Sequence, residues 1–148
     1  MQKSIVKTFD ELTKEELYQI LRLRSEVFVV EQNCVYQDID NHDQKALHLF
    51  VSIHDEIIAY TRLFNAGDHY NEASIGRVLV DKKHRKNNLG HFIIEKSKKA
   101  IISYFNRSVI VVSAQLYLKD FYASHNFIQK GEGYLEDGIP HIKMFFNE

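Results

Sequence analysis

The pattern of hydrophobic and polar positions predicts a domain in which strands and helices alternate. Residues 5–9 are predicted to form a short strand. The helix that follows begins at Thr13, because Glu16 stands at the spacing of a capping box. Its apolar positions recur at helical spacing: Leu17, Ile20, Leu21 and Phe28. Residues 31–45 are polar and acidic without periodicity, and we expect a long loop there.

The apolar runs of the remaining chain complete the predicted order β-α-β-β-β-α-β-α-β-β. Strands are predicted over residues 47–53, 57–64, 74–80, 109–112, 128–135 and 142–146, and helices over residues 89–105 and 116–124. Within the first of these helices, Glu95 and Lys99 have salt-bridge spacing. This order indicates an α/β sandwich in which helices flank a mixed central sheet. No repeat or linker interrupts it, so residues 1–148 are expected to form a single domain.

The composition is that of an ordinary globular protein. Hydrophobic residues make up 45% and charged residues 26% of the 148 positions. The 19 Lys and Arg nearly balance the 20 Asp and Glu, which argues against a general nucleic-acid binder. No signal peptide or membrane-spanning run is evident, and the single cysteine, Cys34, excludes an internal disulfide. We therefore expect a soluble cytoplasmic protein, without a membrane partner.

The strongest local signal is a strand that leads through a basic loop into a helix. Residues 75–80 (IGRVLV) are followed by the loop at residues 81–90 (DKKHRKNNLG) and then by the apolar helix. The unpaired backbone N–H groups in the first turn of a helix form an anion site, and the basic loop adds charge for phosphates. A solvated basic turn explains the same residues, and the composition alone does not separate the two interpretations.

The segment Arg85-Lys-Asn-Asn-Leu-Gly90 resembles the acetyl-CoA pyrophosphate loop of the GNAT N-acetyltransferase superfamily, whose pattern is Arg/Gln-x-x-Gly-x-Gly/Ala. Arg85 and Gly90 match the pattern, and Asn88 stands at the usual first glycine. Asparagine tolerates a left-handed backbone better than other non-glycine residues, so the loop is expected to survive this change. The predicted element order also matches the fold of that superfamily.

Two further segments resemble the ElaA-like branch of the superfamily. These are residues 22–40 (RLRSEVFVVEQNCVYQDID) after the first helix and residues 136–144 (EDGIPHIKM) in the closing hairpin. With the basic loop, the resemblance extends over nearly the whole chain. It implies the transfer of an acetyl group from acetyl-CoA to a primary amine, by direct attack in a ternary complex.

The resemblance also implies which residues hold the acetyl-CoA co-substrate. Strand backbone groups would bind the pantetheine arm, the loop would bind the pyrophosphate, and a residue seven positions before Tyr122 would contact CoA. The corresponding residues are Val78, Leu79, Val80, Arg85, Lys86, Asn87, Asn88, Leu89, Gly90 and Gln115. An ordinary buried strand at residues 78–80 is compatible with this role.

The transfer needs an oxyanion donor, an acid for the departing thiolate and a base for the acceptor ammonium. A backbone N–H at Leu79 or Val80 is expected to serve the oxyanion. Tyr122 matches the family tyrosine four residues before the usual Gly-Phe, here Asn126-Phe127, and is the expected general acid. An apolar helix stripe is the alternative interpretation of Tyr122.

Three residues are candidate general bases, and the sequence does not choose among them. Glu31 lies in the segment after the first helix, His48 begins a predicted strand and His141 follows the closing-hairpin turn. A water relay without a single base is a further alternative. A structural hydrogen bond is the more common role of a histidine.

The acidic stretch after the first helix also has two interpretations. Its carboxylates, Asp38, Asp40 and Asp43, attract a cationic amine or belong to a solvated loop, which we favour. Arg24, Arg62 and Arg77 have apolar neighbours, and we expect them to be partly buried and to pair with these acids or with Glu31.

Other functions compete with catalysis. The asparagines at positions 88 and 126 favour a non-catalytic module that binds or senses acyl-CoA as the main alternative. Residues 82–86 permit a nucleic-acid binder, which the balanced charge disfavours. The histidines lack metal-ligand spacing, so no metal is expected. The acceptor is a small-molecule or peptide amine, and edge strands allow a homodimer.

Overall fold

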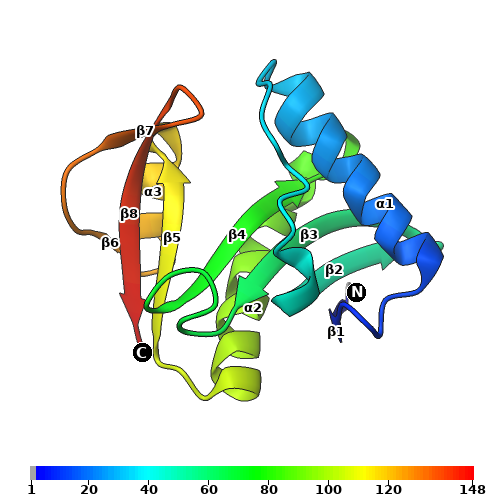
Figure 1. The fold of residues 1–148 in the computed structure, drawn as a ribbon, viewed down its shortest axis with the longest axis horizontal. Helices are drawn as coiled ribbons and strands as arrows, with labels where there is room; N and C mark the ends of the chain where they lie inside the picture. The colour runs from blue at the N-terminus through cyan, green and yellow to red at the C-terminus, as the bar shows by residue number, and fades with distance from the viewer. Residues whose placement is uncertain (1–2) are drawn as a thin grey trace.

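The strands pair into a mixed sheet that parts in the middle, so that the ribbon has two arms (Figure 1). The computed structural model describes residues 3–148. The strands are β1 (Ser4–Thr8), β2 (Leu47–Ile53), β3 (Glu56–Phe64), β4 (Ala73–Val80), β5 (Val109–Gln115), β6 (Ile128–Gln129), β7 (Tyr134–Glu136) and β8 (Ile139–Asn147). Their order is β1-β2-β3-β4-β5-β8-β6, and β7 also pairs with β8. Every pairing is antiparallel except that of β4 with β5. The predicted mixed α/β sheet flanked by helices is confirmed.

Helix α1 (Lys14–Arg24) begins at the predicted capping box. The Thr13 side chain accepts from the Glu16 N–H, and the Glu16 carboxylate accepts from the Thr13 N–H. The helix then widens into a π-helical segment, Ser25–Glu31, which contains the predicted helical position Phe28 and ends where the loop was predicted to begin. Such wide turns are frequent at functional sites. Here the segment buries Val27 in the core and brings Glu31 to the edge of a cleft.

Helices cover both faces of the sheet. On one face, Ile20 and Leu23 of α1 pack with Phe50 and Tyr60 of the sheet. On the other face, α2 (Leu89–Phe105) packs over the larger core cluster, which also receives Tyr122 from α3 (Lys119–Ala123). Glu95 of α2 pairs with Lys98 and His125, so the predicted pairing with Lys99 is wrong. In the part of the chain that the structure describes, no helix is both long and apolar enough to cross a membrane.

The parallel pair β4–β5 is the point at which the arms diverge. The two strands are in register only at Ala73 with Ile110 and at Ser74 with Val111. Beyond Ser74, β4 stays with β3 and β5 stays with β8. The backbone groups that face the gap from these two strands therefore lack a strand partner, which is unusual inside a sheet.

The C-terminal arm differs from the prediction in its details. The predicted strand over residues 128–135 is split into β6 and β7, and β8 begins at Ile139 instead of residue 142. The predicted helix at residues 116–124 starts as a 3₁₀ turn, Leu116–Leu118, before α3. Asp137 and Gly138 have positive φ angles of 51° and 77°, which form a tight hairpin turn between β7 and β8. A short hairpin thus replaces the longer turn that the sequence suggested.

The capping box supplies the first prediction. We expect Thr13→Ala to lower the free energy of unfolding by about 1 kcal/mol, because the Glu16 N–H loses its acceptor. Urea denaturation followed by circular dichroism measures this change. Thr13→Ser keeps the oxygen and is the matched control. An equal loss in both variants would show that the methyl group matters and not the cap.

Candidate active site

The gap between the arms opens into a cleft of about 600 Å³. Its walls come from β4, from β5 with the β7–β8 hairpin, from the π-helical segment and the loop after it, and from α3. Several residues singled out from the sequence line this cleft: Glu31, Val78, Leu79, Val80, Arg85, Gln115, Tyr122 and His141. The fold therefore brings together residues from segments that are distant in the sequence.

The β4 wall contains a β-bulge. Gly76 lies opposite Arg62 and Leu79 lies opposite Tyr60, so Arg77 and Val78 together face the single residue Thr61 of β3. Arg77 has a φ angle of 49°, which is rare for a non-glycine residue within a strand. A bulge bends its strand, so this one helps to turn β4 away from β5.

The direction of the backbone groups at the end of β4 follows from two hydrogen bonds. The Asp81 N–H donates to the Ile58 carbonyl of β3, at 2.7 Å. Adjacent residues of a strand point their backbone groups to opposite sides, so those of Val80 face the cleft. The Val80 carbonyl indeed accepts from Arg85 Nε, at 3.0 Å. The same alternation directs the groups of Leu79 toward β3.

The basic loop leads into a helix start that lacks a side-chain cap. A 3₁₀ turn, Lys82–Asn87, is followed by Asn88 in the left-handed conformation, with φ 57° and ψ 22°. Helix α2 has neither a capping side chain nor an acidic residue in its first turn. Its first backbone N–H groups are thus available to an anion. Lys86 and Asn87 end the 3₁₀ turn, Asn88 precedes α2, and Gly90 is the second residue of that helix. The Leu89 side chain is buried in the core.

Arg85 and Glu31 form an ion pair at the edge of the cleft. The guanidinium makes a bidentate contact, in which it donates to both carboxylate oxygens at 2.6 Å and 3.0 Å. Both side chains are partly exposed. The pair joins the end of the π-helical segment to the loop before α2. The predicted base Glu31 and the predicted phosphate ligand Arg85 are therefore partners in this structure.

Two weaker contacts cross the cleft between the arms. Gln115 Nε2 of β5 donates to Gln32 Oε1, at 3.3 Å. The Cys34 thiol lies 3.8 Å from the Asp137 carbonyl in the β7–β8 turn. Residues 32–34 thus reach from the π-helical segment to the opposite arm.

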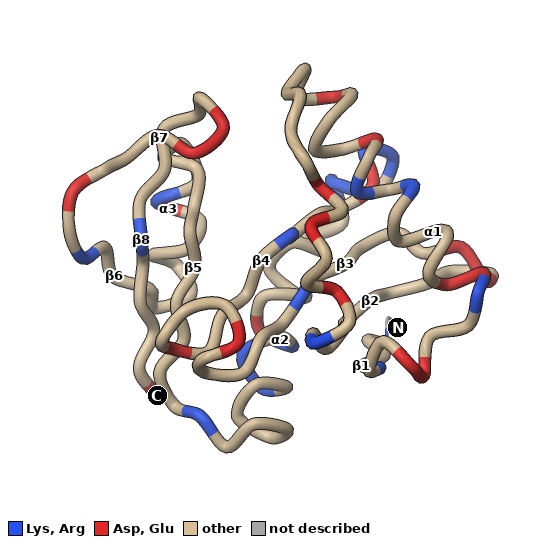
Figure 2. The backbone as a smooth tube through the Cα atoms, viewed as in Figure 1, with Lys and Arg blue, Asp and Glu red and all other residues tan. Residues whose placement is uncertain are grey.

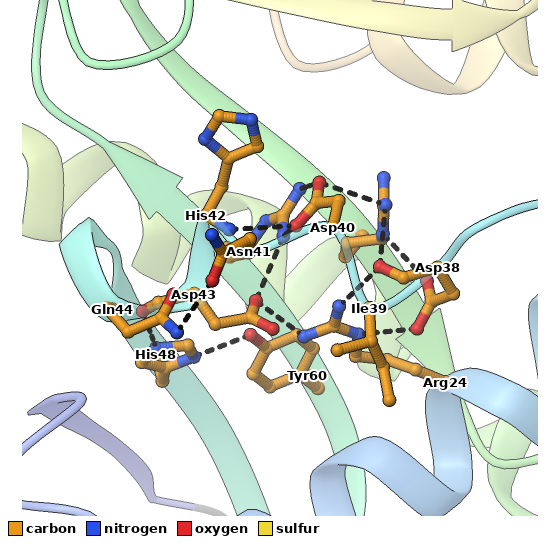
Figure 3. A network of polar contacts seen from close by, with 12 residues as sticks. Arg24, Asp38, Ile39, Asp40, Asn41, His42, Asp43, Gln44, His48 and Tyr60 are labelled. Carbon is orange, nitrogen blue, oxygen red and sulfur yellow. Dashed lines mark hydrogen bonds and ion pairs between the residues drawn. The ribbon is translucent and has the colours of Figure 1, made fainter.

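The acidic loop is held by a network of alternating arginines and aspartates (Figure 3). Arg24, which is fully buried, donates to Asp38 at 3.0 Å and to Asp43 at 2.7 Å. Arg62 also donates to Asp43, at 2.9 Å, and makes a bidentate contact with Asp40 at 2.8 and 2.9 Å. Figure 2 shows the interleaved acidic and basic positions where this loop crosses β3 and β4.

The third arginine of the network is the residue of the β4 bulge. Arg77 Nε lies 2.8 Å from Asp38 Oδ1, and Nη2 lies 3.3 Å from Asp40. These contacts hold the strained residue in place from the loop side. The expected pairing of the three arginines with the loop aspartates is confirmed. The solvated loop that we favoured is wrong, because Asp38 and Asp43 are buried and paired.

The network shifts the pKa values of its carboxyl groups. Desolvation alone would raise the pKa of Asp43, but the hydrogen bonds and charges of Arg24 and Arg62 outweigh it and lower the pKa. The pKa of Asp40 lies well below its usual range for the same reason, with Arg62 as its main partner. Both carboxylates are therefore charged and neutralised, which leaves little attraction for an amine substrate.

His48 lies within the protein and not at the cleft. It is completely buried, with Nε2 2.9 Å from the Asp43 carbonyl and Nδ1 2.6 Å from the Tyr60 hydroxyl. The carbonyl only accepts, so Nε2 donates and Nδ1 accepts from Tyr60. Burial also lowers the pKa of His48. This geometry does not fit the expected role of His48 as a base and instead ties the acidic loop to the sheet.

Tyr122 belongs both to the core and to the cleft wall. Its ring is 5% exposed and makes edge contacts with Phe121 and Phe127. Among residues 3–148 its hydroxyl has no hydrogen-bond partner, although the residue lines the cleft. Burial raises the pKa of this tyrosine, which keeps its proton in place. The apolar stripe and a role at the cleft are thus compatible.

Polar residues that the sequence analysis did not single out line the opposite wall. Ser113 of β5 bonds to the Tyr134 hydroxyl and lies 3.2 Å from Glu136. Glu136 in turn lies 3.4 Å from His141 Nε2. Only the hairpin segment of residues 136–144 drew attention to this region. The pairing of β5, β7 and β8 assembles the cluster, so no local spacing reveals it.

The fold and the parted sheet define an acyltransferase of the GNAT type. The model of the acetyltransferase (GNAT) domain family matches residues 8–147, and the chain belongs to this family. It also belongs to the ElaA-like branch that its sequence segments resemble. The chain is therefore an acyl-CoA-dependent N-acyltransferase by family and fold.

Individual relatives agree with this assignment. The chain is 40% identical to protein ElaA of Escherichia coli over 136 aligned residues. This alignment covers 90% of this chain and 89% of ElaA. The crystal structure of E. coli ElaA matches with a TM-score of 0.92 and 36% identity, over 99% of this chain and 100% of that chain. An acyl-CoA N-acyltransferase from Pseudomonas aeruginosa matches with a TM-score of 0.93 and 36% identity, over 99% of both chains.

The arginine–aspartate network predicts a stability that depends on pH. Because the pKa values of Asp40 and Asp43 are lower in the folded state, their stabilisation is complete above the unfolded value of about 3.9 and is lost as pH falls. We expect Asp43→Asn to cost about 3–5 kcal/mol at neutral pH and to flatten the decline below about pH 4. Urea denaturation across this pH range measures both effects. Asp10→Asn, at an exposed position, is the control and should follow the wild type.

Proposed function

We propose that this chain transfers an acetyl group from acetyl-CoA to a primary amine by direct attack in a ternary complex. The observation that carries the proposal is the parting of β4 and β5 beside the uncapped start of α2. The cleft wall there presents unpaired strand groups and Arg85. The loop that contains Arg85 leads directly to the uncapped N–H groups at the start of α2.

The strand groups suit the pantetheine arm of CoA. The backbone of Val80 faces the cleft and Val78 lines it. The amides of pantetheine are able to pair with such an edge as an added strand does. The side chain of Leu79 is part of the α1-side core, so this residue shapes the wall. Gln115 on the opposite strand lines the same cleft.

The loop and helix start suit the pyrophosphate. The N–H groups of residues 88–90 and the charges of Arg85 and Lys86 would hold it. The left-handed backbone at position 88 is the feature for which glycine is usual, and Asn88 adopts it. Arg85 leaves Glu31 when it binds a phosphate, so CoA binding competes with this ion pair.

The reaction itself uses groups on both walls. A backbone N–H that faces the cleft would donate to the developing oxyanion, and the alternation along β4 favours that of Val80 over that of Leu79. Tyr122 would protonate the departing thiolate, because its hydroxyl is protonated and lacks another partner among the described residues. The acceptor is a small-molecule or peptide amine, and the expected cellular location is the cytoplasm.

The non-catalytic alternative loses its main support in this structure. It rested on asparagines at two positions where glycine is usual. Asn88 and Asn126 have φ angles of 57° and 67°, so both adopt the conformation that those positions require. The loop and the turn after α3 thus keep their backbone geometry.

Calorimetric titration with acetyl-CoA tests the cofactor assignment. We expect Arg85→Ala to weaken binding by about tenfold to a hundredfold, through the loss of a charge-assisted contact. Glu31→Gln should strengthen binding by about two- to fivefold, because Arg85 no longer has to leave a carboxylate. Lys99→Ala, at an exposed position of α2, removes the same charge and should not change the affinity. A failure of the wild type to bind acetyl-CoA would contradict the proposal.

The acid role predicts a separate effect of Tyr122→Phe. This variant keeps the ring contacts with Phe121 and Phe127 but lacks the hydroxyl. We expect kcat to fall by roughly a hundredfold or more while the affinity for acetyl-CoA stays the same. Steady-state release of CoA in the presence of amines, together with calorimetry, measures the two quantities. Unchanged turnover would remove Tyr122 from the mechanism.

A further inference from the structure

His141 and Glu136 face each other across the hairpin turn on the C-terminal arm. Glu136 is the last residue of β7, and His141 is the third residue of β8. The turn brings His141 opposite Tyr134, and their rings stack with centroids 6.1 Å apart. Both His141 and Glu136 line the cleft that contains β4 and Tyr122. His141 is 6% exposed, so packing restrains its ring.

Hydrogen bonding determines which nitrogen of His141 is free to accept a proton. Nδ1 lies 2.7 Å from the Ile139 carbonyl oxygen. A carbonyl oxygen only accepts, so Nδ1 carries a hydrogen in every protonation state that keeps this bond. The neutral ring therefore has its lone pair on Nε2. A backbone carbonyl commonly orients functional histidines in this way.

Nε2 points to the carboxylate of Glu136. The distance from Nε2 to Glu136 Oε2 is 3.4 Å. A neutral Nε2 and a carboxylate are both acceptors, so this approach becomes favourable once Nε2 has taken up a proton. Ser113 lies 3.2 Å from the other carboxylate oxygen and orients it. The carboxylate is therefore placed to pair with the imidazolium that proton transfer would produce.

The other candidate bases are engaged elsewhere. Both ring nitrogens of His48 are bonded within the core, and the carboxylate of Glu31 is paired with Arg85. The titratable groups around His141 are Glu136 and Tyr134 of β7, Tyr70 of the β3–β4 loop and Lys143 of β8, whose Nζ lies 4.7 Å from the centroid of the Tyr70 ring. Burial raises the pKa values of both tyrosines, which keeps them uncharged at neutral pH. Glu136 is the carboxylate that reaches Nε2.

We infer that His141 is the general base for the acceptor amine and that Glu136 is its positioning partner, an inference that rests on the proposed acyl transfer. The acceptor ammonium gives one proton to His141 Nε2. The free amine then forms the N–C bond as the C–S bond breaks. Tyr122 protonates the thiolate, and the proton that the new amide nitrogen loses restores Tyr122. The products are the amide, CoA and one proton, which His141 releases to solvent.

A pair of amines that differ in charge tests the base directly. n-Butylamine is protonated at neutral pH, whereas 2,2,2-trifluoroethylamine is not. His141→Asn keeps a side-chain N–H for the Ile139 carbonyl but lacks Nε2. We expect kcat with n-butylamine and acetyl-CoA to fall by about a hundredfold, and kcat with trifluoroethylamine to change little. His54→Asn, at an exposed turn, is the control and should match the wild type with both amines.

The pH profile of kcat/KM tests the partner. Glu136→Gln removes the charge that pairs with the imidazolium and leaves Nε2 in place. The rise of kcat/KM on the acidic side of the profile, its acidic limb, should therefore move to lower pH. Glu132→Gln, at an exposed position on the same arm, should leave the limb unchanged. In His141→Asn the limb should disappear, and the rate should follow the fraction of free amine. A purely structural role for Glu136 would not move the limb.

The outcomes separate this inference from the proposed function. An equal loss with both amines in His141→Asn, or a limb that stays in place in Glu136→Gln, overturns the inference alone if the wild type turns over. Wild-type protein that binds acetyl-CoA but releases no CoA with either amine overturns both. Calorimetry with acetyl-CoA on each variant confirms that the protein is folded. The Glu136 side chain is 45% exposed, so its substitution does not disturb the core.

Discussion

The function of this chain depends on a sheet that is paired at one end and open at the other. β4 and β5 share two pairs of residues and then diverge, so each presents backbone groups that no other strand satisfies. Inside a protein such groups are costly unless a ligand or water takes the place of the missing strand. The same divergence forms the cleft, and the loop after β4 leads from it to the uncapped start of α2. Site and fold are thus consequences of one interrupted ladder.

The arginine–aspartate network maintains this opening from the N-terminal arm. Arg24, Arg62 and Arg77 hold the loop after the π-helical segment against β3 and β4, and Arg77 is also the strained residue of the bulge. Because each buried charge depends on its partners, the loop cannot loosen at one residue without exposing unpaired charge at another. The network therefore supports one wall of the cleft. Its arginines also pair with the aspartates that the sequence offered as a binding site for a cationic amine.

Asparagine occupies many of the left-handed backbone positions in this chain. Asn33, Asn41, Asn88, Asn106 and Asn126 all have positive φ angles. Two of them stand where the GNAT pattern has glycine, and their conformation explains why the loop survives. The tolerance of asparagine for this region is a local property, which is why the sequence alone predicted the outcome at Asn88. The same reasoning applies to the capping box of Thr13 and Glu16, whose partners are three residues apart.

The sequence by itself determined the order of the elements as far as α3, the family and the loop before α2, and it named the loop aspartates among the possible partners of the arginines. These follow from local spacing and from residue types that must be neutralised when buried. Only the tertiary structure decided which candidate bases reach the cleft. It buried His48, paired Glu31 with Arg85 and joined His141 to Glu136 and Ser113. These contacts join segments that are far apart in the chain, and they depend on strand register and on a π-helical turn. No periodicity along the sequence records such a register, because it is set by the packing of the whole sheet.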